Sequence, residues 1–217
     1  MGMLKHILNL FFPIRSLAHE EEGEWIRPND ERLLRSQPSY EDRLALQRRG
    51  ILNLDRLVAY GSYDGLPLLR TAVQTFKYKR VPSLGAFLGQ LMVRATPLLR
   101  QEQVPVLCPV PLHWSRHFAR GFNQATLLAE SVGAVRGWKV KHILVRTRPT
   151  GHQAWRNRTQ RRSSVKDAFA VRGNAPMPYS VVLVDDIATT GSTLDACARV
   201  LKEAGVVRVE ALVLALG

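Results

Sequence analysis

The chain has 217 residues, enough for one full domain and a small appendage, and 46% of them are hydrophobic. The apolar stretch at residues 7–12 is interrupted by Asn9 and is too short to span a membrane, and no small-residue cleavage site follows it. We therefore expect a cytoplasmic protein with no membrane span. The only two cysteines, Cys108 and Cys197, lie in apolar patterns, which predicts reduced core thiols.

The net charge of +13 is distributed unevenly along the chain. Residues 1–42 hold eight acids and five Lys or Arg, for a net charge of −3, whereas residues 131–166 hold ten Lys or Arg and no acid. Most of the basic excess is therefore concentrated in one stretch. A polyanion or a multiply charged phosphate ligand is the partner that such a stretch favours.

Hydrophobic periodicity divides the chain into alternating strands and helices. Residues 18–42 are polar and aperiodic, so we assign residues 1–42 to an N-terminal appendage and 43–217 to the main domain. The pattern predicts strands at 56–63, 104–112, 140–145, 168–171, 181–186 and 206–216, and helices at 66–76, 84–99, 123–132 and 194–204. This alternation predicts an α/β fold, with a parallel sheet flanked by helices on both faces.

The most informative segment covers residues 181–193, where four apolar residues lead into Asp185 and Asp186 and then into a loop rich in Thr, Gly and Ser. A buried strand would place both carboxylates at the carboxyl edge of the sheet, where α/β folds bind ligands. The loop leads to a helix N-terminus, whose N–H groups and dipole favour a phosphate. These features predict a sugar phosphate site; the alternative is a plain strand–loop–helix unit with an Asp-capped turn.

At nearly every position this segment resembles the PRPP (phosphoribosyl pyrophosphate) motif of the type I phosphoribosyltransferases. The resemblance implies that Asp185 and Asp186 are the catalytic pair, which holds the ribose 2- and 3-hydroxyls. It implies that the 5-phosphate is bound by Ala188, Thr189, Thr190, Gly191, Ser192 and Thr193. It also implies Mg²⁺ on the departing pyrophosphate, and electrostatic catalysis in which carboxylates stabilise an oxocarbenium-like sugar.

Four further stretches are similar to one branch of these proteins, the ComF/GntX family linked to DNA uptake in competent bacteria. They are Phe76-Lys77-Tyr78-Lys79, Pro109-Val110-Pro111-Leu112, Arg120-Gly121-Phe122-Asn123-Gln124 and the segment from Thr150 to Phe169, so that the resemblance covers residues 56–217. By this resemblance the loop from Pro109 to Leu112 lies on the pyrophosphate side. The candidate contacts there are Arg116, Arg120, Lys77 and Lys79, with solvated surface charges as the alternative.

The basic tract allows three interpretations. It contains Arg146, Arg148, Arg156, Arg158, Arg161 and Arg162, with His152 and Trp155 between them. The resemblance implies a mobile loop that closes over the sugar phosphate and excludes water. Arginines interleaved with aromatic rings also suit single-stranded DNA, through backbone attraction and base stacking. The third interpretation is a solvated basic loop; the first two are compatible with each other.

One departure from the family concerns metal binding. ComF-like proteins commonly begin with a four-cysteine zinc finger, but residues 13–42 contain no cysteine. Arg15, Ser16 and Ala18 stand where thiolates would be expected, and His19 alone cannot hold zinc. We predict no zinc site and no other metal site formed by the chain.

The resemblance implies a competence protein that binds PRPP or a related ribose phosphate and handles single-stranded DNA during natural transformation. Its expected partners are a competence helicase and other transformation proteins. Two alternatives are a nucleobase salvage phosphoribosyltransferase and a non-catalytic PRPP-sensing module. No GxxxxGK[ST] loop is present, which excludes a nucleotide-dependent motor, so that the energy for DNA transport would come from a partner.

Overall fold

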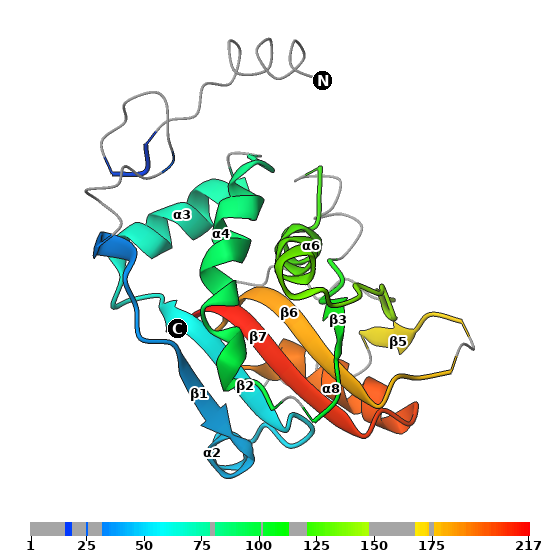
Figure 1. The fold of residues 1–217 in the computed structure, drawn as a ribbon. Helices are drawn as coiled ribbons and strands as arrows, with labels where there is room; N and C mark the ends of the chain where they lie inside the picture. The colour runs from blue at the N-terminus through cyan, green and yellow to red at the C-terminus, as the bar shows by residue number, and fades with distance from the viewer. Residues whose placement is uncertain are drawn as a thin grey trace.

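A five-stranded sheet with the strand order β1-β2-β7-β6-β3 forms the centre of the protein (Figure 1). The computed structural model describes residues 16–18, 25, 32–78, 81–100, 102–112, 121–147, 168–173 and 176–217. The strands are β1 (Ser39–Asp42), β2 (Arg56–Ser62), β3 (Val106–Pro109), β6 (Ser180–Ala188) and β7 (Arg208–Leu216). Within this sheet β1 pairs with β2 in an antiparallel sense, and the other three pairings are parallel. The predicted α/β fold with a largely parallel sheet is confirmed.

Helices cover both faces of this sheet, as expected. In Figure 1, α3 (Pro67–Tyr78), α4 (Leu84–Val93) and α6 (Gln124–Arg136) lie in front of the strands, and α8 (Ser192–Glu203) lies behind them. The short helix α2 (Arg43–Arg48) follows β1. A small antiparallel hairpin, β4 (Leu144–Arg146) with β5 (Phe169–Val171), packs in the same hydrophobic cluster as α8.

Two hydrophobic cores result, one on each face of the sheet. Val182 and Val184 of β6 pack with the α3, α4 and α6 side, and Val181 and Leu183 pack with the α8 side. Neighbouring side chains of a strand point to opposite faces, which explains why β6 needs a continuous apolar run to be buried on both faces. Both cysteines are free and fully buried in the α8 core, as predicted.

Several element boundaries differ from the predicted ones. The predicted helix at 84–99 ends at Val93 and is followed by a short 3₁₀ helix, η2 (Thr96–Leu98), which contains Pro97 and so lacks one backbone N–H. The strand predicted to begin at Val104 begins at Val106, and Val104 is 74% exposed. Helix α6 extends to Arg136, four residues beyond the prediction, because the left-handed Gly137 ends it.

The segment assigned to the N-terminal appendage contributes to the sheet. Ser39 to Asp42 form β1, which pairs with residues 56–59 of β2. Upstream of β1, the carbonyl oxygen of Leu34 accepts a hydrogen bond of 2.5 Å from the buried Tyr60 hydroxyl. The end of this segment is therefore integrated with the main domain, and the two-domain division at residue 42 stays a prediction. Among the described residues, no helix is long and apolar enough to cross a membrane.

Candidate functional site at the carboxyl edge of the sheet

The acidic pair lies where the parallel strands end together. On one side of β6, the Val110 amide that follows β3 donates to the Val184 carbonyl oxygen at 3.0 Å. On the other side, the Gly217 amide that follows β7 donates to the Ala188 carbonyl oxygen at 2.9 Å. The structure thus places Asp185 and Asp186 at the carboxyl edge, as the sequence predicted, and their binding role stays a prediction.

The two aspartates face opposite sides of the sheet because they are neighbours in one strand. Asp186 lies on the α3 side, where its Oδ1 is 2.9 Å from the Lys77 ammonium. Only 8% of the Asp186 side chain and 18% of the Lys77 side chain are exposed. Asp185 lies on the α8 side and accepts a hydrogen bond from the Asp186 amide at 2.8 Å. Sequence analysis placed Lys77 among the pyrophosphate contacts; in the structure its ammonium contacts this carboxylate.

The pair is electrostatically asymmetric. Loss of solvation, followed by the negative charge of Asp186, raises the pKa of Asp185 to about 7. The positive charges of Lys77 and Arg146 and the hydrogen bond from the Asp186 amide act in the opposite direction. Asp185 therefore exchanges its proton near neutral pH, a property that sequence spacing alone does not give.

The predicted phosphate loop is closely confined at its glycine. Gly191 has a φ of +73° and comes directly before α8, and a Cβ built on it would lie 2.4 Å from Cδ1 of Ile51. The Thr190 and Ser192 hydroxyl oxygens are 3.0 Å apart, and the Ser192 amide points to the Thr190 hydroxyl at 3.4 Å. Thr189 is exposed, and Ser192 and Thr193 are partly exposed. Hydroxyl groups therefore lie at the start of a helix, a position that favours a phosphate.

Two contacts that sequence analysis missed support this loop. Arg49, the residue after α2, donates from Nη2 to the Thr189 carbonyl oxygen at 2.8 Å and is itself held by both carboxylate oxygens of Glu41 in β1. In the first turn of α8, Asp195 Oδ1 accepts from the backbone amides of Leu52 and Asn53 at 2.8 and 2.7 Å. The residues that hold the loop thus come from distant segments, and no local sequence pattern marks them.

The stretches near Phe76, Pro109 and Arg120 meet beside the acidic pair. The rings of Phe76 and Phe122 are 5.5 Å apart between centroids. Asn123 begins α6, accepting from the Ala125 amide, while its Nδ2 donates to the Val110 carbonyl oxygen at 3.0 Å. The start of α6 is thereby tied to the loop that follows β3.

Most of the predicted basic contacts lie outside the described residues. These are Arg116, Arg120, Lys79, Arg148, Arg156, Arg158, Arg161 and Arg162. Arg146 is described: it ends β4, and its guanidinium lies 5.3 Å from the centre of the Phe169 ring. Within the described part of the chain, no three His, Cys, Asp or Glu side chains are grouped so that they could hold a metal ion.

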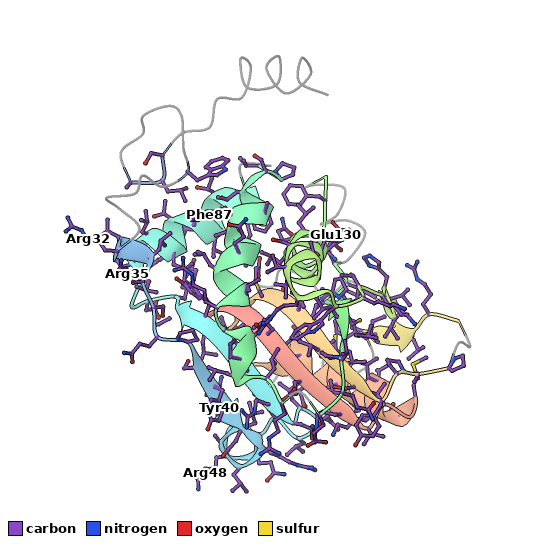
Figure 2. The ribbon with its side chains drawn as sticks, viewed as in Figure 1. Arg32, Arg35, Tyr40, Arg48, Phe87 and Glu130 are labelled. Atoms are coloured by element: carbon purple, nitrogen blue, oxygen red, sulfur yellow. The ribbon has the colours of Figure 1, made fainter. Side chains whose placement is uncertain are left out.

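The opposite, amino edge of the sheet carries an open hollow of about 420 Å³ that sequence analysis did not anticipate. Its lining residues are Asp42, Arg43, Leu44, Asp55, Arg100, Lys202, Val207 and Arg208. The Asp55 carboxylate accepts from Lys202 Nζ and from the Val209 amide, each at 2.9 Å. Nearby, the Arg56 guanidinium lies 4.2 Å from the centre of the Tyr40 ring, whose position Figure 2 labels. The lining thus combines four cationic side chains with two carboxylates.

Comparisons with known proteins identify relatives of the chain. A family model described as "Phosphoribosyl transferase domain" matches residues 155–217. The chain is 32% identical to Competence protein F of Haemophilus influenzae over 166 residues, which cover 72% of this chain and 70% of that protein. It is 33% identical to the DNA utilization protein YhgH of Salmonella typhimurium over 162 residues, covering 71% and 69%. It is 38% identical to Competence protein ComFC of Bacillus subtilis over 100 residues, covering 46% and 39%.

Proposed function

The chain belongs to the ComF family of competence proteins with a phosphoribosyl transferase domain, and on this premise we propose that its carboxyl-edge site binds PRPP or a related ribose 5-phosphate. The observation that carries the proposal is the strand–loop–helix unit from Asp185 to α8. It joins a carboxyl with a pKa near neutrality to a hydroxyl-rich loop closed by Gly191. The carboxyl suits sugar hydroxyls, and the helix start suits a phosphate.

Mg²⁺ belongs to this proposal as part of the ligand. The described carboxylates do not form a cluster of the kind that would hold a resident ion. Mg²⁺ commonly stays largely hydrated and binds through substrate phosphates. We therefore assign it to the pyrophosphate oxygens of PRPP, where it would neutralise the leaving group.

Calorimetry with PRPP and magnesium tests the binding site. We expect the double variant Asp185→Asn with Asp186→Asn to lose measurable binding, because the Asn side chains lack the negative charge of the two carboxylates. A matched control is Glu130→Gln with Glu203→Gln, which removes two carboxylates from exposed positions on α6 and α8 (Figure 2 labels Glu130). Equal affinity of the double aspartate variant and the native protein would refute the site assignment.

Turnover separates the functional alternatives. Incubating the protein with PRPP, magnesium and a panel of nucleobases, while following pyrophosphate release, distinguishes a salvage enzyme from a binding protein. Release that depends on one base favours salvage. Binding without release for any base favours the competence or sensing role.

We also propose that the basic tract gives the protein affinity for single-stranded DNA. The proposal is supported by the charge of residues 131–166 and by relatives named for competence and DNA utilization. Arg146, at the start of the tract, lies on an aromatic ring of the β4–β5 hairpin. Such a surface would attract the DNA backbone and leave base stacking to the interleaved aromatic residues.

Salt dependence of oligonucleotide binding tests this second part. Each phosphate contact contributes about 0.7 to the slope of log affinity against log salt for a single strand. Changing Arg156, Arg158, Arg161 and Arg162 to Gln is expected to reduce that slope by about 2 to 3. The matched control changes Arg32, Arg35, Arg43 and Arg48 to Gln. Figure 2 shows Arg32, Arg35 and Arg48 away from the β4–β5 hairpin. Equal slopes for the two variants would contradict the proposal.

A further inference from the structure

The ion pair between Lys77 and Asp186 engages one member of the acidic pair. The ammonium and the carboxylate oxygen are 2.9 Å apart, and both side chains are largely enclosed by protein. Solvent screens such a pair weakly, and removal of one partner would leave the other as an uncompensated buried charge. Asp186 is therefore tied to Lys77 on the α3 face of β6.

Asp185 has a different environment on the α8 face. Among the described residues, the charged and titratable groups that interact with it are Asp186 on β6, Lys77 on α3, Arg146 on β4 and Cys197 on α8. Burial raises the pKa of the Cys197 thiol well above its ordinary value, so this group is neutral. Asp185 is also more exposed than Asp186, which is 6% exposed. A ligand therefore reaches Asp185 more easily.

The proposed phosphate loop is continuous with the same face. It leads through Gly191 into α8, which packs on the side of the sheet that Asp185 faces. A phosphate at the first turn of α8 and a hydroxyl group at Asp185 would therefore lie on one side of β6. Lys77 approaches from the other side.

Building on the ribose phosphate site proposed above, we propose that Lys77 is a positioning residue that divides the acidic pair into two roles. It anchors the Asp186 side chain in an ion pair, and Asp185 is the carboxyl that accepts the ribose hydroxyls. Two adjacent carboxylates repel each other, so a nearby cation is needed for both to be charged at neutral pH. Lys77 supplies this cation without occupying the side on which the sugar binds.

The division of roles predicts a proton linkage. Hydroxyl donors favour the ionised carboxyl, so ligand binding releases a proton from Asp185 at pH values below about 7. The affinity for ribose 5-phosphate therefore rises with pH and levels off above about pH 7. Without the positive charge of Lys77, Asp185 keeps its proton to higher pH. The pH at which the affinity levels off therefore rises by about one unit or more, equivalent to a tenfold loss of affinity at pH 7.

The experiment measures ribose 5-phosphate affinity by calorimetry from pH 5.5 to 9. We expect Lys77→Met to raise the pH at which the affinity levels off. Lys77→Arg should restore the native value of that pH, because Arg keeps the positive charge. The ligand phosphate also titrates near pH 6, but this contribution is common to every variant. Lys202→Met is the matched control, because it breaks a lysine–aspartate pair of similar length at the amino edge. Its profile should follow that of the native protein.

A second comparison is independent of the folding of Lys77→Met. The variant Lys77→Met with Asp186→Asn removes both charges of the ion pair, and we expect it to lose about tenfold or less in affinity, whereas Asp185→Asn loses more than a hundredfold. Equal losses in these two variants, or an unshifted profile in Lys77→Met, would overturn the division of roles. Failure of the native protein to bind ribose 5-phosphate or PRPP would instead overturn the proposed function.

Discussion

Asp55 and Asp185 lie at opposite edges of the same sheet, and their surroundings differ in kind. At the amino edge, Asp55 is bound by the Lys202 ammonium and the Val209 amide, each at 2.9 Å. At the carboxyl edge, loss of solvation dominates and raises the pKa of Asp185 to about 7. A carboxylate with its donors in place stabilises the fold, whereas one held in an unfavourable environment is available to a ligand. The amino edge thus serves stability, and the carboxyl edge holds a carboxyl in an unfavourable environment, as the proposed binding site would require.

The largest expected effect concerns the loop beside Asp185. Gly191→Ala introduces a Cβ 2.4 Å from Cδ1 of Ile51, which is itself only 2% exposed, and requires a left-handed backbone of +73°. We expect it to lower the free energy of unfolding by about 2 to 4 kcal/mol and to abolish ribose phosphate binding. Chemical denaturation measures the first effect.

Gly137 offers a matched control for this substitution. Its φ is +69°, close to that of Gly191, but no atom of the described residues lies within 4 Å of the Cβ that alanine would add. Gly137→Ala should therefore cost only the conformational part, about 1 kcal/mol, and leave ligand binding intact. If the two variants lose equal stability, the close contact with Ile51 has no energetic weight.

The next effect tests the amino edge. Asp55→Ala removes the acceptor for the Lys202 ammonium and for the Val209 amide, and we expect the free energy of unfolding to fall by about 2 kcal/mol. Ribose phosphate affinity should not change, since the site lies at the other edge of the sheet. A large loss of affinity in a folded variant would show that the two edges are coupled.

The sequence predicted the parts of the site that depend on local pattern. Val181 to Val184 specify a strand buried on both faces, and the period of Leu194, Cys197 and Leu201 specifies the helix after the loop. Contacts between distant segments were beyond this reasoning. Arg49 holds the carbonyl of Thr189 across 140 positions of sequence, and no periodicity encodes such a pairing.

Lys77 shows the same limit in a different way. Its residue type and position suggested a contact with an anion, and the structure provides one, but the anion is Asp186 of the protein itself. Choosing between a protein carboxylate and a ligand phosphate requires knowing that the end of α3 lies beside β6. The different environments of Asp185 and Asp186 follow from their opposite faces of the strand, and the burial of each face depends on the packed helices.

Substitution of Asp185 should raise the free energy of unfolding, whereas substitution of Asp55 should lower it. Its carboxyl has a pKa of about 7 in the folded protein and about 4 in the unfolded chain, so the folded state binds more protons between these values. The free energy of unfolding therefore falls as the pH rises from 4 to 7. Asp185→Asn keeps an acceptor for the Asp186 amide and removes this cost.

We expect Asp185→Asn to be more stable than the native protein by about 1 to 2 kcal/mol at pH 8, and equally stable at pH 4. Thermal unfolding at both pH values measures the difference. A variant that is destabilised at pH 8 would mean that Asp185 is a structural carboxylate like Asp55, and the contrast between the two edges would be lost.

The smallest effect distinguishes the partners of Asp55 from one another. Arg43 is 3.7 Å from the Asp55 carboxylate, and 61% of its side chain is exposed. Exposed pairs of this kind contribute little because solvent screens them, so Arg43→Ala should change the free energy of unfolding by less than about 0.5 kcal/mol. Lys202 Nζ is closer, at 2.8 Å from Asp55 Oδ2, and its side chain is 27% exposed, so Lys202→Met should have the larger effect. Chemical denaturation of the two variants side by side decides whether the amino edge owes its stability to the enclosed contacts of Asp55. Comparable losses in the free energy of unfolding would assign that stability to the surface charge instead.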